Sequence, residues 1–275
     1  MASTWHRRTF LQLSSFALPM LGAMRKNEEW GDKMPNDENP GPQPLPDLFP
    51  TQPPELTREM VTVAHFDLKR VKELVEARPS LAKAAWDWGF GDWESALGAA
   101  SHMGNRPIAE YLLSKGARPS LFSAAMLGQV DVVKAFVKAQ SGVQRIRGPH
   151  SISLLAHAKA GGEPAHAVLE FLQELGDADA EPQIALSAED ETAIRGTYVF
   201  GIAANQQIDV TTERGQALWT RKGTMGRPLF HLGQREFYPL GASAARIHFA
   251  EETGTIVMTV RDPDLVLKAR KKEVK

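Results

Sequence analysis

The sequence predicts an α+β multidomain protein in which a helical repeat array precedes a small antiparallel β-barrel-like domain. Between residues 56 and 178, apolar residues recur at spacings that place them on one face of a helix. From about residue 194 to residue 275, apolar and polar residues alternate, as they do in half-buried antiparallel strands. Residues 179–193 are expected to link the two parts, and the chain ends in a basic tail.

The composition is that of a globular protein without a nucleic-acid-binding surface. Of the 275 residues, 43% are hydrophobic and 24% are charged, which are ordinary values. The net charge of -1 gives no basic footprint for nucleic acid. Because the chain has no cysteine, disulfides, thiol nucleophiles and thiolate metal ligands are excluded.

Residues 1–23 resemble a twin-arginine export signal. Arg7 and Arg8 precede Thr9 and Phe10, and a moderately apolar stretch continues to Ala23. This stretch is shorter than the ~20 residues that cross a bilayer, so no membrane span is expected unless the signal stays uncleaved as a tether. The resemblance implies a periplasmic or secreted protein. The prolines of residues 24–55 predict a disordered linker, because they fix φ and remove backbone donors.

Four segments predict the second helix of a helical pair. Each has a small or β-branched residue, two spacers and then two apolar residues: Val71/Leu74/Val75, Ala109/Leu112/Leu113, Val133/Phe136/Val137 and Val168/Phe171/Leu172. A lone helix cannot bury such a face, so neighbouring helices must stack against it.

Residues 56–178 resemble about four ankyrin repeats. The resemblance depends on residues 92–100 with 108–117, and on residues 127–134. Gly104 and Gly128 are 24 residues apart, against a period of ~33, so one inter-repeat hairpin is expected to be missing. The first repeat is degenerate and is interpreted as a cap. The resemblance implies a scaffold that recognises partners, usually proteins.

The C-terminal segment is similar to the small β domain appended to serine beta-lactamase-like hydrolases. The similarity is carried by residues 196–198, 208–212, 217–219, 230–232 and 235–238, which are strands and aromatic residues without a catalytic signature. It implies an accessory binding role. Ser80 and Lys83 have the Ser-x-x-Lys spacing of beta-lactamases, but the companion motifs are absent from the sequence.

One short stretch is the candidate binding site for a partner protein, a peptide or a glycan. It contains Trp86, Asp87, Trp88, Phe90, Asp92, Trp93 and Glu94. Flat aromatic rings beside carboxylates suit a peptide or sugar ligand, because rings stack while carboxylates fix polar groups. The alternative is that the rings seal the degenerate first repeat against the second.

His150, in a later loop, is added to this candidate site. His102, His150 and His157 could meet around a metal ion after folding, but none has a two-ligand helical spacing. Structural roles are favoured, and no metal ligand, cofactor-binding residue or catalytic residue is assigned.

The sequence therefore leaves two functions open. The first is an exported, non-enzymatic protein that binds another protein through the repeats, with an accessory β domain. The second is a periplasmic hydrolase or carbohydrate-binding protein that uses the Trp-rich loop and nearby histidines and carboxylates. A pocket that brings His150 within hydrogen-bond reach of Asp92 or Glu94 would favour the enzyme.

Overall fold

The computed structural model describes residues 44–45, 47–179, 184–203, 206–213, 215–221 and 226–273. The chain divides into two compact units, Met1–Pro53 and Pro54–Lys275. In the first unit, the described residues form a turn at residues 47–50. The predicted export signal, residues 1–23, and most of the predicted linker, residues 24–55, lie outside the described residues.

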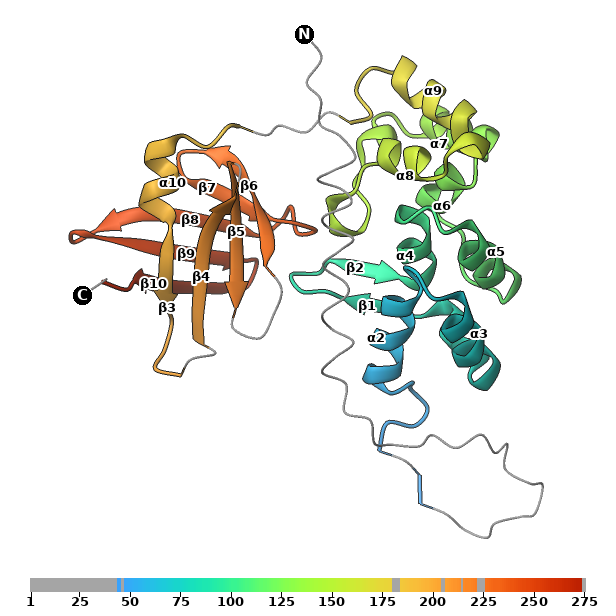
Figure 1. Ribbon diagram of the computed structural model, residues 1–275, viewed down its shortest axis with the longest axis horizontal. Helices are drawn as coiled ribbons and strands as arrows, with labels where there is room; N and C mark the ends of the chain where they lie inside the picture. The colour runs from blue at the N-terminus through green and yellow to red at the C-terminus, as the bar shows by residue number, and fades with distance from the viewer. Residues whose placement is uncertain are drawn as a thin grey trace. The chain divides into compact units, whose positions relative to one another are not determined.

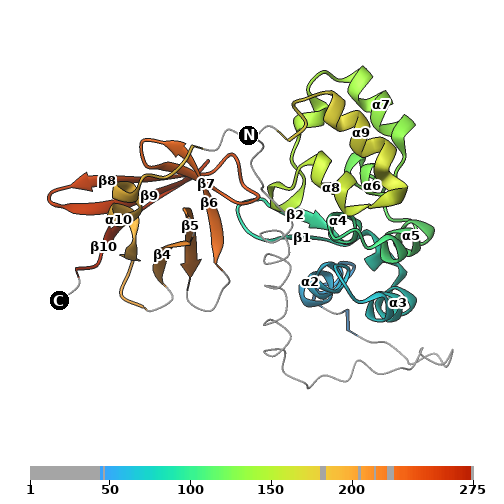
Figure 2. The ribbon, with the colours of Figure 1, turned by 45° about the horizontal axis from the view of Figure 1, so that its top comes forward.

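The helical part of the second unit contains short helices that pack in consecutive pairs. They are α2 (Pro54–Val63) with α3 (Leu68–Ala77), α4 (Ala96–His102) with α5 (Arg106–Ser114), α6 (Leu121–Met126) with α7 (Val130–Ala139), and α8 (Leu154–Ala160) with α9 (His166–Glu174). Figure 2 shows the two helices of each pair side by side. Side chains at the helix starts accept backbone N–H groups: Asp67, Ser95, Asn105, Ser120 and Ser153.

A β-hairpin joins the first pair of helices to the second. After the 3₁₀ helix η2 (Pro79–Lys83), strand β1 (Ala85–Asp87) pairs with β2 (Trp93–Ser95). The turn between them has positive φ at Gly89, Phe90 and Gly91, a conformation that favours glycine. Ser95 ends β2 and caps α4, so the hairpin leads directly into that helix. This connection fixes the position of the last residues of β2 relative to α4.

The predicted ankyrin-type repeat array is wrong. Within the described residues, the helices range from 6 to 10 residues and their connections differ from one pair to the next. A hairpin precedes α4, an irregular loop precedes α6, and two 3₁₀ turns, η3 (Val143–Arg145) and η4 (Pro149–Ser151), precede α8. An array of identical units needs a constant period, and the short interval between Gly104 and Gly128 breaks it. The four amphipathic segments therefore predict the helices correctly, but the repeat architecture inferred from them is wrong.

The regular architecture of the described residues is a closed antiparallel β-barrel (Figure 1). Its strands are β3 (Gly196–Val199), β4 (Gln207–Glu213), β5 (Gln216–Arg221), β6 (Arg227–Gly233), β7 (Glu236–Pro239), β8 (Arg246–Glu252), β9 (Thr255–Asp262) and β10 (Leu265–Lys271). Pairing of β10 with β3 closes it, for example at Arg270 opposite Val199. Tyr198, Phe237 and Phe249 are fully buried in its core. The barrel interior is thus filled with side chains.

The segment before the barrel also differs from the prediction. Residues 188–193, expected to be part of a linker, form most of helix α10 (Ala188–Ile194). Ser187 caps this helix and three acidic residues fill its first turn, which is favourable at the positive end of the helix dipole. Ile194 anchors it in the barrel core, and its carbonyl accepts the Tyr198 hydroxyl. In the part of the chain that the structure describes, no helix has the length and apolar character needed to cross a membrane.

Candidate metal centre

Four side chains from separate parts of the helical region converge on one point. One donor atom from each of His65, Glu94, His102 and His150 lies within 4.8 Å of the others. His65 is in the turn after α2, Glu94 is in β2, His102 ends α4, and His150 is in η4. Three histidines and one carboxylate are therefore assembled from segments that are as much as 85 positions apart (150 minus 65).

Glu94 is at the middle of the cluster. Its Oε1 lies 2.8 Å from His102 Nε2, and its Oε2 lies 3.5 Å from His65 Nε2. The same Oε2 lies 3.3 Å from His150 Nε2. It also accepts the Trp88 indole N–H at 2.8 Å. Glu94 is entirely buried, and all three imidazoles present Nε2 to its carboxylate.

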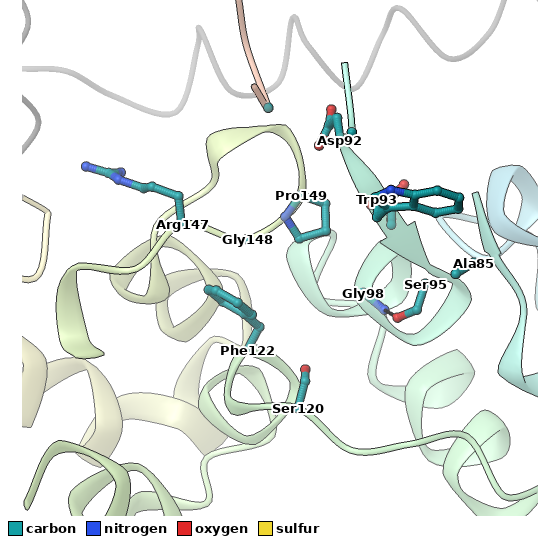
Figure 3. A pocket seen from close by; sticks show the side chains of 13 residues that line it. Ala85, Asp92, Trp93, Ser95, Gly98, Ser120, Phe122, Arg147, Gly148 and Pro149 are labelled. Atoms are coloured by element: carbon teal, nitrogen blue, oxygen red, sulfur yellow. Dashed lines mark hydrogen bonds between the residues drawn. The ribbon is translucent and has the colours of Figure 1, made fainter. Parts of the chain in front are cut away.

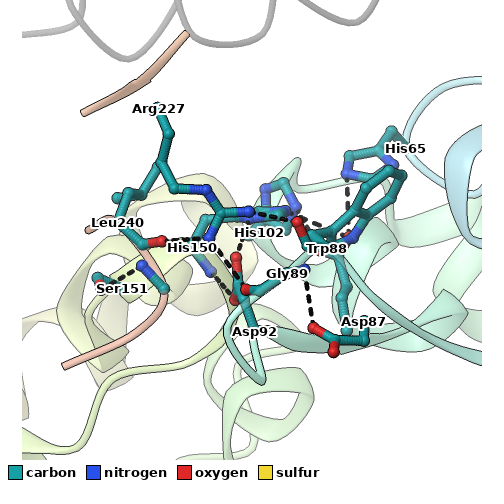
Figure 4. Close-up of polar contacts among 12 residues, drawn as sticks. His65, Asp87, Trp88, Gly89, Asp92, His102, His150, Ser151, Arg227 and Leu240 are labelled. Atoms are coloured by element: carbon teal, nitrogen blue, oxygen red, sulfur yellow. Dashed lines mark hydrogen bonds and ion pairs between the residues drawn. The ribbon is translucent and has the colours of Figure 1, made fainter. Parts of the chain in front are cut away.

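Contacts behind the ligands fix the orientation of two imidazoles. His65 Nδ1 lies 3.0 Å from the carbonyl oxygens of Val61 and Thr62, so it carries a proton and donates. His150 Nδ1 donates to Asp92 Oδ2 at 2.9 Å, as Figure 4 shows. When the ring is neutral, each Nε2 is left with a lone pair that faces the cluster. This is the arrangement typical of histidines that bind metals.

The electrostatics of the cluster call for a cation. Asp92 and Glu94 are both buried, and buried carboxylates need compensating positive charge. Burial raises the pKa of Glu94, but hydrogen bonds and charge from His102 and His150 outweigh it and lower that pKa well below its usual range. Burial lowers the pKa of His150, yet its bonds to Asp92 and Glu94 raise it to about 10. Without a metal ion, protons supply the positive charge.

The net pKa shift of His65 is opposite to that of His150. Burial lowers the pKa of the His65 imidazole more than the charge of Glu94 raises it. His65 is therefore biased toward the neutral form, which is the form that binds metals.

Residues of β6 and of the segment after β7 hold the loops that carry the site. The Arg227 guanidinium donates to the carbonyl oxygen of Gly89 at 3.1 Å and also to that of Trp88. The Gly241 N–H donates to Ser151 Oγ at 2.9 Å, next to His150. Figure 4 shows Arg227, Gly89 and Ser151 around the cluster. The hairpin turn and η4 are thus fixed from outside the helical region.

A pocket of about 480 Å³ lies beside the cluster. Its lining includes Asp92, Trp93, Glu94, Phe122 and Pro149, which Figure 3 labels except for Glu94. The Trp93 side chain lies at this pocket and is one of the large apolar residues that stay exposed, at 64%. The pocket therefore has aromatic walls and adjoins two carboxylates.

The structure separates the predicted site residues into two groups. Asp92, Glu94 and His150 come together, and Trp88 donates to Glu94. The others are distributed around the hairpin. Trp93 lines the pocket, and Trp86 packs on the helical core. Asp87 accepts the Gly89 N–H at 2.8 Å, and the ring centroids of Phe90 and Trp219 are 5.4 Å apart. The predicted set thus contains both cluster residues and residues that shape the loop.

Two donors were not assigned from the sequence. His102 had been given a structural role, and His65 carried no local signal, because its partners come from β2, α4 and η4. His157, the other histidine considered for a metal, lies outside the donor set: its Nδ1 donates to the Ser153 carbonyl oxygen at 2.9 Å. Its Nε2 is buried without a hydrogen-bond partner among the described residues.

Comparison with known proteins yields no match: the chain fits no protein-family model, and neither a curated protein nor a solved structure is significantly similar to it. The function is therefore inferred from the geometry of the centre.

Proposed function

We propose that this protein binds one divalent first-row transition-metal ion, with Zn²⁺ the best match. The ligands are Nε2 of His65, His102 and His150 and the carboxylate of Glu94. The convergence of these donors carries the proposal. Around a tetrahedral Zn²⁺ ion with bonds of 2.0–2.2 Å, neighbouring donors lie about 3.4 Å apart. The distances of 3.3 and 3.5 Å from Glu94 Oε2 to His150 and His65 match this spacing, and His102 lies 2.8 Å from the other oxygen. Because all four donor atoms lie within 4.8 Å of one another, closure around one ion needs shifts of up to about 1.4 Å.

The donor set also indicates the class of metal. Imidazole nitrogen suits Zn²⁺, Cu²⁺, Fe²⁺ and Ni²⁺, whereas Mg²⁺ and Ca²⁺ prefer sites built of oxygen ligands. A set of three imidazoles and one carboxylate contains a single oxygen-bearing residue. The site is therefore expected to discriminate strongly against the alkaline-earth ions.

Of the two functions left open by the sequence, we favour the periplasmic hydrolase. His150 lies within hydrogen-bond reach of both Asp92 and Glu94, beside a pocket, which is the arrangement that favours an enzyme. Zn²⁺ would supply Lewis-acid chemistry to a substrate oxygen or to bound water, provided that one of the four ligands leaves or a fifth position opens. The predicted twin-arginine export signal remains part of the proposal. A protein exported by this route crosses the membrane already folded, which is compatible with a metal centre built from distant segments.

Recognition of another protein is the second candidate function. The exposure of Trp93 favours it, because a large aromatic side chain at a pocket mouth is typical of a binding surface. Removal of the metal distinguishes the two candidates. It should abolish the activity of a hydrolase, whereas it should leave the capture of a protein partner unchanged.

Metal content tests the proposal directly. Protein purified without a metal-affinity tag should carry one Zn²⁺ per chain by mass spectrometry, and the chelated protein should take it back in a calorimetric titration. His65→Ala should lower the affinity for Zn²⁺ by about a thousandfold or more, since it removes a ligand whose ring is held in place by the end of α2. His166→Ala is the matched control, because that histidine is an exposed surface residue whose side chain is 57% accessible.

If the wild-type protein takes up no Zn²⁺, or if both variants bind it equally well, the proposed function is wrong.

A further inference from the structure

We infer that His150 is an exchangeable ligand, and that the coordination position it leaves accepts the carbonyl oxygen of an amide whose apolar part occupies the adjoining pocket. This inference rests on the proposed metal-binding function. It adds that three ligands stay bound while the fourth exchanges, and it names the chemical class of the compound that competes with the fourth.

Three ligands are held by regular structure. Glu94 lies in β2, and His102 closes α4, which follows β2 without a loop. His65 lies in the turn two residues after the end of α2, and its ring is bonded to the carbonyl oxygens of the last turn of that helix. All three side chains are largely buried, with accessibilities of 14%, 0% and 6% for His65, Glu94 and His102. Two histidines and one carboxylate are by themselves a sufficient set in metal sites that keep a position open.

His150 differs from these three ligands in its backbone. It lies in the short turn η4 and has a φ of 57°, and Ser151 after it has a φ of 56°. Two successive residues with side chains are thus in the left-handed region, which is unfavourable for both. The His150 side chain is also the most accessible of the four, at 24%. Departure of His150 would relieve backbone strain, whereas the other three ligands have no positive φ to relieve.

Besides the ligand Glu94, one further carboxylate, that of Asp92, holds His150 in place. Asp92 accepts the His150 backbone N–H through Oδ1 and the ring Nδ1–H through Oδ2, each at 2.9 Å. When His150 leaves, both oxygens become acceptors without donors next to the vacated position. A compound that binds there must therefore bring an N–H for Asp92 as well as an oxygen for the metal. An amide carries both groups on adjacent atoms.

The pocket adjoins the segment that carries His150. Gly148 and Pro149, directly before His150, form part of its lining, and so do Asp92 and Glu94. Trp93 and Phe122 complete this side with aromatic rings, which Figure 3 shows around Pro149. A compound in the pocket thus lies against Asp92 and against the two residues that precede His150. The aromatic lining favours an amide with an apolar or aromatic substituent.

The experiment uses the full chain loaded with Co²⁺, whose visible spectrum reports the number and kind of ligands. In His150→Ala the affinity for Co²⁺ should fall by about 10- to 100-fold. In His65→Ala it should fall by about a thousandfold or more. Benzamide, which has a carbonyl oxygen next to an N–H, should change the spectrum of both wild type and His150→Ala. It should bind the variant at least about tenfold more tightly, because the imidazole no longer competes.

Two comparisons test the chemistry of the competing compound. Benzoate, which lacks the N–H and adds a negative charge near Asp92, should bind more weakly than benzamide. Trp93→Ala should weaken benzamide binding several-fold and leave acetamide binding unchanged, since only benzamide has a ring for the pocket.

The outcomes distinguish this inference from the proposed function. If His150→Ala loses Co²⁺ as completely as His65→Ala, or keeps it but gives no spectral response to benzamide, His150 is not exchangeable and the inference is wrong while metal binding stands. If wild type binds no Co²⁺, both are wrong. His150→Gln, which retains a donor for Asp92, replaces His150→Ala in each comparison if circular dichroism shows the latter to be unfolded.

Discussion

Asp92 and His150 are joined twice, by the backbone N–H and by the ring Nδ1–H of the histidine, each 2.9 Å from a different oxygen of the carboxylate. This pair connects the hairpin turn to η4 across 58 positions of sequence. It sets both the tautomer and the direction of the His150 ring, so Nε2 faces Glu94. The arrangement of the whole centre therefore depends on where Asp92 is held.

Gly241→Ala tests that dependence. A Cβ on Gly241 would lie 2.1 Å from Asp92 Oδ2, so the carboxylate must move and His150 must turn with it. We expect the Zn²⁺ affinity to fall by about 10- to 100-fold in a competition titration. Gly254→Ala is the matched control, because Gly254 has a similar φ, 78° against 81°, and nothing within 4 Å of an added Cβ. Equal Zn²⁺ affinity of the two variants would show that Asp92 does not position the ligand.

Glu94→Ala should strongly destabilise the metal-free protein. The change leaves the Trp88 indole N–H and the neighbouring histidines without their shared buried acceptor. Removing one partner of a buried ion pair costs about 3–5 kcal/mol of the free energy of unfolding. Glu110→Ala, at an exposed position of α5, should change it by less than about 0.5 kcal/mol. Urea denaturation in the presence of a chelator measures both, and a loss below about 1 kcal/mol for Glu94→Ala would contradict the account.

The tryptophans of the hairpin should separate into structural and binding residues. Trp88→Phe removes the donor to the buried Glu94, which should cost about 1–3 kcal/mol of the free energy of unfolding. Trp93→Ala should cost less than about 1 kcal/mol, because that ring is mostly exposed. Thermal melting gives the comparison. A larger loss for Trp93→Ala than for Trp88→Phe would mean that Trp93 seals the fold instead of lining a binding pocket.

His157 should make the metal-free protein less stable in mild acid. Burial lowers its pKa from 6.5 to about 4, so below pH 6.5 the unfolded chain takes up a proton that the folded chain does not. Its contribution to stability is complete above pH 6.5 and is lost as the pH falls toward 4. Between pH 7 and pH 5 the loss should be about 2 kcal/mol.

The control for this prediction is His157→Phe, which has no proton to take up. The free energy of unfolding should fall less steeply with pH in the variant than in the wild-type protein. Identical slopes would show that His157 is not buried in its neutral form.

The local structure of this chain could be predicted from its sequence more successfully than its architecture. The amphipathic segments, such as Val71 to Val75 and Ala109 to Leu113, fall within α3 and α5, because helical periodicity is a local property. How helices stack depends on contacts between distant segments, and unequal connections prevented the regular array that the pattern suggested. Alternating residues such as Ile247 and Phe249 do line the closed barrel, since alternation follows from the strand itself.

The candidate site was predicted only in part, for a similar reason. Asp92 and Glu94 stood out because carboxylates and aromatic rings were concentrated in one stretch, and His150 because it lies in a loop. His65 and His102 become ligands only when α2 and α4 bring them to Glu94. No pair among these histidines has the short spacing by which two ligands on one helix are recognised, so their convergence could not be seen before the fold was known.

X-ray absorption at the zinc edge, on protein loaded with one equivalent of Zn²⁺, is the most direct test of the central claim. The account predicts a first shell of nitrogen and oxygen at about 2.0–2.1 Å with the multiple-scattering signal of imidazole rings, and fewer rings in His65→Ala than in wild type. The control His166→Ala should give the wild-type spectrum. A spectrum of hydrated Zn²⁺ without imidazole scattering, or one unchanged by His65→Ala, would contradict the claim that His65, Glu94, His102 and His150 form a metal centre.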